Sequence, residues 1–254
     1  MQIILLKKFK IQKMKNILHI ISSPRVEVSA SRKLGKAVIE KIQEKYPDVV
    51  VKERDLSKDS IPILEEVHIN TFFTPVESHS QEQAAINEYS TGLISELQEA
   101  DIIVVDSPMY NFSVPASLRA YFDFTSRAGY TFKYDENGPK GLLNNKKLYI
   151  AFTSGNIYSE GPYQVYDSNV PYVKNIFGFY GVTDVSVFRA EGLSIPGIQE
   201  TAMEKAIEAI IIDQFSDITR KGRLTNLQSS FLIGFSQSRF DQLEMEKRAK
   251  ARSY

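Results

Sequence analysis

Short, wholly apolar runs alternate along the chain with stretches in which apolar residues recur every three or four positions. The short runs predict five β-strands, at residues 17–21, 49–51, 101–106, 147–152 and 185–188. The stretches between them predict helices, around residues 34–42, 81–100, 115–126, 163–180 and 198–212. Runs of Val and Ile without polar alternation are typical of strands covered on both faces. We therefore expect an α/β fold, with a doubly wound five-stranded parallel sheet and helices on both faces.

Two segments depart from this alternation. Residues 57–80 show no clear period and have prolines among their apolar positions, so we interpret them as a long connection with about one turn of helix. Residues 131–134 are followed by Glu136-Asn137-Gly138-Pro139, which has the composition of a turn. We expect this part of the chain to leave the sheet and return.

The alternation occupies residues 15–213, which we predict to be one domain. A domain of that size buries about 70% of the surface that its unfolded chain exposes, enough for a stable core. Residues 1–14 are a basic extension that we expect to lie outside the fold, with Met14 as the natural first residue. Residues 214–254 are a basic tail, which either packs on a partner subunit or has no part in the fold.

Composition excludes several kinds of chemistry. The chain has no cysteine, which excludes disulfides, thiolate zinc sites and a cysteine nucleophile. Its three histidines, His19, His68 and His79, are isolated from one another, so we expect no metal site.

The formal net charge of zero conceals an uneven distribution. Residues 1–15 carry five positive charges and no negative one, and residues 214–254 carry a net +4, which leaves −9 for residues 16–213. An acidic domain argues against nucleic-acid binding, which normally needs a basic excess. No apolar run has the length of a signal-peptide core or a membrane span, so we expect a cytoplasmic protein.

The loops after the first, third and fourth strands are where a ligand is expected, because open α/β sheets bind ligands at the carboxyl ends of their strands. No loop has the glycine spacing of a dinucleotide-binding or Walker motif. After the first strand, hydroxyl groups gather where a helix begins, and Ser23, Ser29 and Ser31 could bind a phosphate. Equally, one of these serines could be an ordinary helix cap that needs no ligand.

The loop after the third strand, residues 107–115, is bounded by prolines and contains Tyr110, Asn111 and Phe112. Proline restricts the backbone, so this loop could hold a planar ring, although its aromatic residues could also belong to the core. The loop after the fourth strand is Thr153-Ser154-Gly155-Asn156-Ile157. It is small enough to let its backbone approach a ligand, but its composition is also ordinary for a turn.

Several motifs together resemble one family. They are Pro108-Met109-Tyr110-Asn111-Phe112-Ser113-Val114-Pro115, Arg127-Ala128-Gly129-Tyr130-Thr131-Phe132-Lys133-Tyr134, Glu136-Asn137-Gly138-Pro139 and Gly141-Leu142. In these residues the chain resembles the FMN-dependent NADH azoreductases, which are flavodoxin-like NAD(P)H:quinone oxidoreductases. The resemblance covers residues 15–212, about four-fifths of the chain.

The resemblance implies which residues bind FMN. The phosphate contacts fall on Ser23 and on Ser29-Ala30-Ser31, the ring contacts on Met109-Tyr110-Asn111-Phe112, and the far edge of the ring on Ser154-Gly155-Asn156. The last loop departs from the family pattern Thr-Ser-Arg-Gly-Gly-Ile, because it is one residue shorter and lacks the arginine. Phe112, Tyr134 and Phe179 would line the face where nicotinamide and acceptor alternate.

The resemblance also implies a homodimer with two FMN sites at the subunit interface. It implies a ping-pong reaction in which NADH or NADPH passes two electrons through FMN to a quinone or an azo compound. No protein acid or nucleophile is then expected to carry the chemistry. Three alternatives stay open: a flavodoxin-like electron carrier without NAD(P)H oxidation, a serine hydrolase, and a flavin-free structural or regulatory domain. The hydrolase would need a histidine beside an activated serine, and the sequence offers no such pair.

Overall fold

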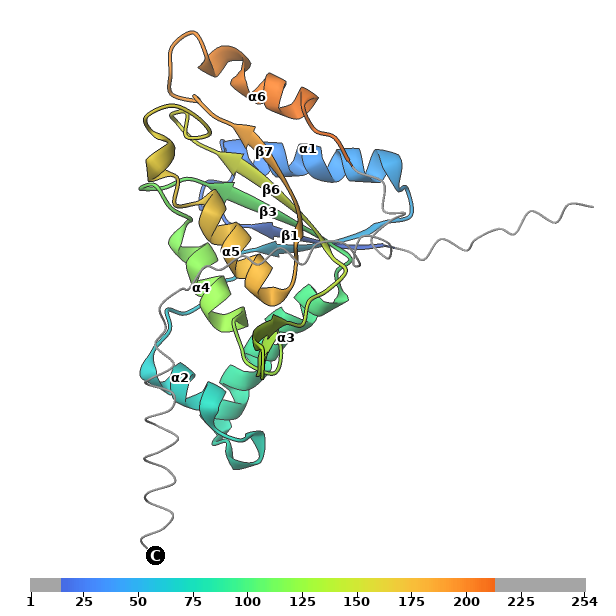
Figure 1. Ribbon diagram of the computed structural model, residues 1–254, viewed down its shortest axis with the longest axis vertical. Helices are drawn as coiled ribbons and strands as arrows, with labels where there is room; N and C mark the ends of the chain where they lie inside the picture. The colour runs from blue at the N-terminus through green and yellow to red at the C-terminus, as the bar shows by residue number, and fades with distance from the viewer. Residues whose placement is uncertain (1–14, 213–254) are drawn as a thin grey trace, which may run out of the picture. The chain divides into compact units, whose positions relative to one another are not determined.

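The computed structural model describes residues 15–212, and five parallel strands form its main sheet (Figure 1). The strands are β1 (Asn16–Ile21), β2 (Val50–Asp55), β3 (Ile102–Pro108), β6 (Lys147–Thr153) and β7 (Asp184–Ala190). Their order is β2-β1-β3-β6-β7, so the direction of winding reverses between β1 and β3. The predicted doubly wound fold is confirmed. Ligands in such sheets bind where the winding reverses, at the carboxyl ends of the strands.

Helices cover both faces of this sheet. On one face lie α1 (Ala30–Lys45) and α6 (Gln199–Glu208), which contact each other and the strands below them. On the other face lie α3 (Gln81–Glu99), α4 (Ala116–Thr125) and α5 (Val170–Tyr180), and Figure 1 shows the sheet between the two layers. Every residue of β3 and β6 is buried, as expected of central strands covered on both faces.

The larger apolar core lies between the sheet and the α3–α5 layer. Aromatic residues of α4 and α5 fill it, and the rings of Phe122 and Phe177 meet edge to face at 5.7 Å. Burial of such rings removes a large apolar area from water, which makes this layer the main source of stability. It also fixes the direction in which α4 and α5 leave the carboxyl end of the sheet.

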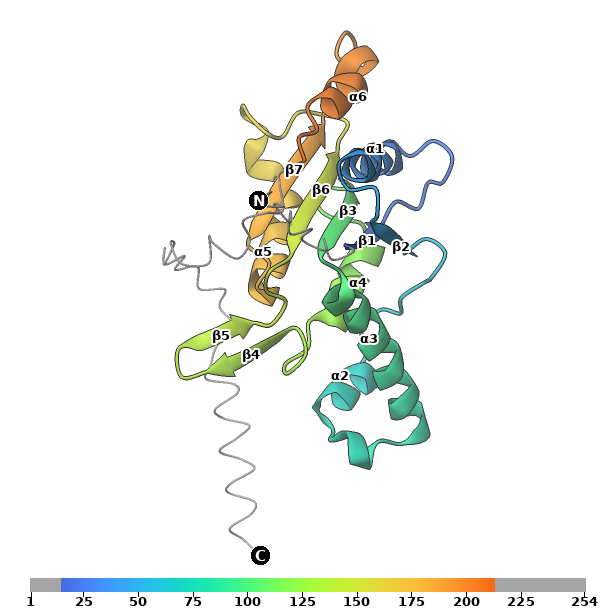
Figure 2. The same cartoon turned by 90° about the vertical axis from the view of Figure 1, so that its right-hand side faces the viewer.

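A two-stranded hairpin, β4 (Phe132–Asp135) and β5 (Gly138–Gly141), stands at the amino end of the sheet (Figure 2). It is the predicted excursion. The hairpin packs on the end of α5, where a Cβ on Gly141 would lie 2.1 Å from the backbone nitrogen of Gly181. Leu143 N–H also donates to the carbonyl of Tyr180 at 2.7 Å. The hairpin is therefore fixed to α5 at the end of the sheet opposite the predicted ligand loops.

Residues 57–80 contain more helix than the sequence predicted. The segment forms α2 (Glu66–Phe73) and a 3-10 turn, η1 (Val76–Ser78). The apolar period is obscured because His68 and Thr71 occupy the buried face of α2. The His68 ring packs edge-on against Phe124 at 5.0 Å, and its Nδ1 accepts a hydrogen bond from Glu65 N–H.

Residues 163–180 are not one helix, as predicted, but a 3-10 turn, η2 (Gln164–Tyr166), followed by α5. The chain breaks between them because the Asp167 carboxylate accepts the N–H groups of Asn169 and Val170 at 3.0 and 3.1 Å, which starts a new helix.

Two other boundaries differ. α6 ends at Glu208, short of the predicted residue 212, and β3 continues through Ser107 and Pro108, beyond the predicted end of this strand at residue 106. These two residues pair with the end of β6. The predicted basic segments 1–14 and 214–254 lie outside the described residues.

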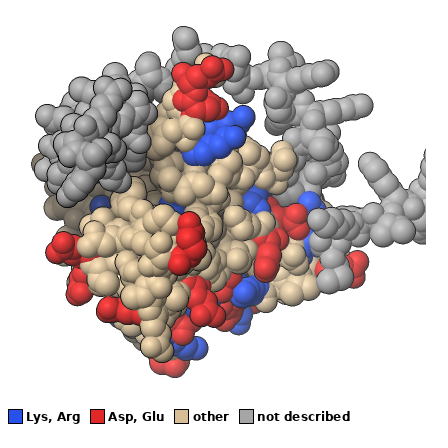
Figure 3. All heavy atoms as spheres, turned by 90° about the horizontal axis from the view of Figure 1, so that it is seen from below, with Lys and Arg blue, Asp and Glu red and all other residues tan. Residues whose placement is uncertain are grey.

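Acidic side chains lie scattered over the face seen in Figure 3, with basic side chains spread between them rather than gathered into a patch. This agrees with the negative charge predicted for the domain. Among residues 15–212, no helix is both long and apolar enough to cross a membrane.

Gly35 provides a test of the packing between α1 and the sheet. A Cβ at this position would lie 1.7 Å from Oδ1 of Asp106 and 2.9 Å from Nε2 of His19. We expect Gly35→Ala to lower the free energy of unfolding by about 1–3 kcal/mol, measured by urea denaturation. The control is Gly92→Ala in α3, where no atom lies within 4 Å and helix propensity should raise stability by about 0.5–1 kcal/mol. Equal stability of the two variants would contradict the close packing of α1.

Candidate functional site

The loop from β1 to α1 brings buried serines to the carboxyl end of β1. Ser29 caps α1, and its hydroxyl accepts the N–H of Arg32 at 3.3 Å. The hydroxyl oxygens of Ser29 and Ser31 lie 3.2 Å apart. The N–H groups of Ala30 and Ser31, which open the helix, have no acceptor within residues 15–212. This end of α1 can therefore bind an anion through hydroxyl and backbone donors, as helix N-termini do.

Arg32 ties this loop to the end of β2. Its guanidinium donates to both carboxylate oxygens of Asp55, at 2.8 and 2.9 Å, and to the carbonyl of Ser23 at 2.9 Å. Burial alone would raise the pKa of Asp55, but hydrogen bonds from Arg32 and Ser57 outweigh it and lower the pKa from 3.8 to about 2. The pair remains ionised at neutral pH and fixes the loop without adding net charge.

A tight turn follows β3. Tyr110 and Ser113 exchange two backbone hydrogen bonds of 3.0 Å, and between them Asn111 and Phe112 have φ angles of 49° and 70°. Positive φ at both central residues is the geometry of a type I′ turn, which favours Asn-Gly. A phenylalanine there stores roughly 1–3 kcal/mol of strain. The N–H groups of Asn111 and Phe112 have no acceptor in the described part of the chain, so the turn presents two donors beside an aromatic ring.

One buried side chain holds both ends of this turn. The Asn169 amide, at the start of α5, donates to the carbonyls of Pro108 and Ser113 at 3.2 and 3.1 Å. Its oxygen accepts the hydroxyl of Ser107 at 2.7 Å. The neighbouring Ser168 N–H donates to the carbonyl of Phe112 at 3.0 Å. These bonds leave the turn little freedom to relax from its strained conformation.

The loop after β6 is closed on itself. The Ser154 hydroxyl donates to the carbonyl of Asn156 at 2.7 Å, and Asn156 Oδ1 accepts the N–H of Ile157 at 2.8 Å. Ser194 N–H donates to the carbonyl of Gly155 at 2.9 Å, and a Cβ on Gly155 would lie 2.8 Å from the Ser194 hydroxyl. The loop after β6 therefore packs closely against the loop that contains Ser194.

Arg189 connects that loop to the start of α5. From β7, its guanidinium reaches Asp167 at 2.8 Å and Glu191 at 3.2 Å, while Glu191 accepts the N–H of Tyr158 at 2.8 Å. The Phe112 ring lies 6.2 Å from the ring of Tyr158. Through Glu191, Arg189 therefore helps to hold the backbone at Tyr158, whose ring lies beside Phe112 in the strained turn.

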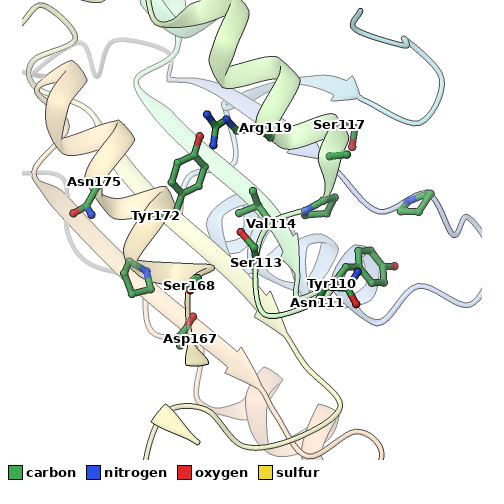
Figure 4. A pocket seen from close by; sticks show the side chains of 14 residues that line it. Tyr110, Asn111, Ser113, Val114, Ser117, Arg119, Asp167, Ser168, Tyr172 and Asn175 are labelled. Carbon is green, nitrogen blue, oxygen red and sulfur yellow. The ribbon is translucent and has the colours of Figure 1, made fainter. Parts of the chain in front are cut away.

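A cavity of about 990 Å³ lies beside the turn, between the first turns of α4 and α5 (Figure 4). Arg119 from α4 lies over the ring of Tyr172 from α5, 5.4 Å from its centroid. Of the predicted site residues, Tyr110 and Asn111 line this cavity. Among residues 15–212, no group of three or more His, Asp or Glu side chains could hold a metal ion.

Comparison with known proteins gives the family. A family model described as flavodoxin-like fold matches residues 15–211. The chain is 44% identical to an FMN-dependent NADH:quinone oxidoreductase of Herminiimonas arsenicoxydans over 72% of this chain and 89% of that protein. A protein of Burkholderia lata, FMN-dependent NADH:quinone oxidoreductase 6, is 42% identical over 78% of this chain and 98% of its own length. The chain belongs to the flavodoxin-like FMN-dependent NADH:quinone oxidoreductase family.

Solved structures agree with this assignment. The crystal structure of an azoreductase from Bacillus anthracis str. Sterne superposes with a TM-score of 0.73 at 32% identity, over 77% of this chain and 96% of that one. An FMN-dependent NADH-azoreductase from Bacillus anthracis str. Ames Ancestor, solved in complex with FMN, has a TM-score of 0.69 at 26% identity, over 77% and 97%. The resemblance inferred from the sequence motifs is confirmed.

The structure places the predicted contact residues of this family at three neighbouring strand ends. Ser23, Ser29, Ala30 and Ser31 follow β1, and the group from Met109 to Phe112 follows β3. Ser154, Gly155 and Asn156 follow β6. Because β1, β3 and β6 are adjacent in the sheet, the three groups form one edge. Their role as contacts stays a prediction.

Two predicted residues lie elsewhere in the chain. Tyr134 is in the hairpin and Phe179 is near the end of α5, both at the amino end of the sheet, whereas Phe112 is at the carboxyl end. The rings of Phe132 and Phe179 pack together at 4.4 Å. A single chain therefore does not bring Tyr134 and Phe179 to Phe112.

The residues present fit FMN at both of its ends. Two unpaired N–H groups and two hydroxyls at the start of α1 match the acceptor oxygens of a phosphate. Two unpaired N–H groups in the turn after β3 match the polar edge of a flavin ring, and the strained geometry that exposes them indicates a function.

The strain at Phe112 can be measured. Phe112→Gly and Phe112→Ala both remove the ring, but only glycine adopts positive φ without strain. We expect the glycine variant to be the more stable by about 1 kcal/mol in urea denaturation without flavin. At position 92, which lies within a helix, the protein with alanine should be more stable than the protein with glycine. The stability order of the glycine and alanine proteins should therefore be opposite at positions 92 and 112. An alanine variant as stable as the glycine variant at position 112 would show that the turn is unstrained.

Proposed function

We propose that this chain is an FMN-dependent oxidoreductase that moves electrons from NADH to quinones and aromatic azo compounds. The observation that carries the proposal is the strained turn after β3, whose two unpaired N–H groups and aromatic ring face the edge of the sheet where ligands bind. The names of the relatives support this choice of cofactor, donor and acceptor.

In this proposal each end of FMN has its own residues. Ser23, Ser29, Ala30 and Ser31 would hold the phosphate, and Met109, Tyr110, Asn111 and Phe112 would hold the ring, with Ser154, Gly155 and Asn156 at its far edge. FMN, when bound, supplies the hydride chemistry that no side chain here can supply. The chain contributes alignment, and the N–H groups of Asn111 and Phe112 would face the ring atoms where negative charge develops.

The donor and acceptor would use one binding face in turn. Phe112 flanks that face with the rings of Tyr158 and Tyr166, at 6.2 and 5.3 Å from its own. A slot lined by aromatic rings favours planar molecules, which nicotinamides, quinones and azo dyes all are. A ping-pong scheme follows, because one slot cannot hold donor and acceptor together. NADPH could enter the same slot. We place the protein in the cytoplasm, where its reduced nicotinamide donor is available.

A homodimer would complete the site. Tyr134 is 65% exposed at the amino end of the sheet, which leaves its ring free to contact a second copy. Pairing two chains about a twofold axis would let the hairpin and α5 of one chain approach Phe112 of the other. Tyr134 and Phe179 would then line the same face as Phe112, one from each subunit.

The purified protein provides the first test. Protein loaded with FMN should be yellow, and anaerobic NADH should bleach it. Asn111→Ala should weaken FMN binding or slow bleaching, because the φ of 49° at this position is unfavourable for alanine. Gly92→Ala, remote from the site, serves as the control. Protein that takes up no FMN on dialysis would refute the proposal, and FMN that binds but is not reduced by NADH or NADPH would favour the electron carrier.

The contribution of two chains to one site can be tested by mixing variants. Phe112→Ala and Tyr134→Ala should each lower quinone turnover by up to about tenfold, as expected for loss of one aromatic contact. A hybrid dimer of the two variants has one intact site if the subunits share residues across the interface. Mixed subunits should therefore recover about a quarter of the wild-type activity after exchange. No recovery in a mixture that sedimentation shows to be dimeric would place both residues in the same subunit's site.

A further inference from the structure

A buried carboxylate near the loop between β1 and α1 (residues 22–29, the serine loop) has no role in the chemistry described so far. Asp106 lies in β3 and is fully buried, with Oδ1 2.8 Å from Nε2 of His19 in β1. Its second oxygen, Oδ2, has no hydrogen-bond partner in the described part of the chain. A buried, half-satisfied carboxylate is costly, so its presence needs a reason.

This pair lies beneath α1, about one helical turn from the predicted phosphate end of the site. The helix α1 crosses it at Gly35, where even a Cβ would collide with both side chains. Ser31 precedes Gly35 by four residues and shares its face of the helix, so it lies about 6 Å farther along the axis. The hydroxyl of Ser22, next to Ser23, donates to the carbonyl of Asp106 at 2.5 Å. The Asp106 backbone therefore fixes the start of the serine loop.

The charges around His19 and Asp106 explain why the Asp106 carboxylate needs a partner. Burial raises the pKa of Asp106, and His19 and Arg32 oppose that rise while Glu53 of β2 adds to it. Arg32 is already engaged by Asp55. His19 is therefore the group placed to cancel a negative charge on Asp106, by sharing one proton with it.

We propose that His19 and Asp106 are positioning residues for the phosphate of FMN. The Asp106 backbone holds Ser22 in place, and the proton shared with His19 keeps an uncompensated negative charge from lying beneath the phosphate. The proposal rests on the proposed FMN site. Loss of the proton to solvent at high pH leaves the pair with one negative charge, and this charge opposes the phosphate. A bound phosphate in turn makes the pair keep its proton to higher pH.

Riboflavin, which lacks the phosphate, isolates this effect. Flavin-stripped full-length protein is titrated with FMN and with riboflavin, and binding is followed by quenching of flavin fluorescence from pH 6.5 to about 9, the range above the second ionisation of a phosphate. Wild-type affinity for FMN should fall as the pH rises, whereas affinity for riboflavin should stay constant. Asp106→Asn keeps the size of the side chain and removes its charge, and should abolish this difference.

Variants at His19 give the complementary result. His19→Leu removes the group that opposes the burial-driven rise in the pKa of Asp106, so at pH 6.5 Asp106 should keep its own proton and the ratio of the FMN and riboflavin affinities should stay close to that of the wild type. As the pH rises and Asp106 ionises without a partner, FMN binding should weaken relative to riboflavin binding. His19→Leu combined with Asp106→Asn should restore the ratio of the two affinities. His68→Leu, at another buried histidine remote from the loop, is the matched control and should leave the ratio unchanged.

The outcomes separate this proposal from a structural role. If His19→Leu weakens both flavins equally, or if Asp106→Asn keeps the wild-type pH dependence, the pair does not act on the phosphate and the proposal is overturned. Asp106→Asn alone decides the question if the leucine variants do not fold. A wild-type protein that binds neither flavin would instead refute the proposed function itself.

Discussion

The strained turn after β3 is the feature on which the candidate site depends, because it fixes where the two free N–H groups and the Phe112 ring are presented. A phenylalanine at a φ of 70° would relax if its neighbours allowed it. The Asn169 amide prevents this by bonding to the carbonyls on both sides of the turn. Since Asn169 itself is fixed at the start of α5, the packing of α5 on the sheet is transmitted to the turn. The apolar core thereby supports the strain, as is common at functional sites.

The two ends of the site are built on different physical principles. At the start of α1 the Arg32 guanidinium is paired with the Asp55 carboxylate, and the Asp106 carboxyl group lies against the His19 ring, so that the donors for an anion stand beside groups that have partners. At the turn after β3 the donors are neutral N–H groups and the surroundings are aromatic. A molecule with a phosphate at one end and a flat ring at the other matches this division.

The fold was predictable because its signals are local. Apolar runs and helical spacing involve residues that are close in sequence, so they can be recognised without the structure. The carboxyl ends of the predicted strands then indicate which loops are expected to bind a ligand. Ser29 and the residues from Met109 to Phe112 could be found in this way. Asn169 could not, because its partners Pro108 and Ser113 are more than fifty residues away and its neighbours in sequence carry no motif.

The sequence analysis misses Arg32 and Arg189 and predicts too little helix at α2, for related reasons. Both arginines act through partners on other elements, Asp55 for one and Asp167 for the other, and an isolated arginine in the sequence reads as a surface residue. In α2 the buried face contains His68, whose polar ring hides the apolar period. Buried polar groups whose partners are distant in sequence cannot be identified from sequence patterns.

The charge of the domain appears at first to oppose the binding of a phosphate. Residues 16–213 carry −9, so an approaching anion meets a repulsive field at long range. Salt screens that field over about 8 Å under physiological conditions, whereas N–H and hydroxyl donors act at contact. At contact the field comes from the first turn of α1, beside which Arg32 is paired with Asp55. Recognition of an anion by this acidic domain would therefore depend on local dipoles and, in our proposal, on His19 as the partner of the buried Asp106 carboxyl group.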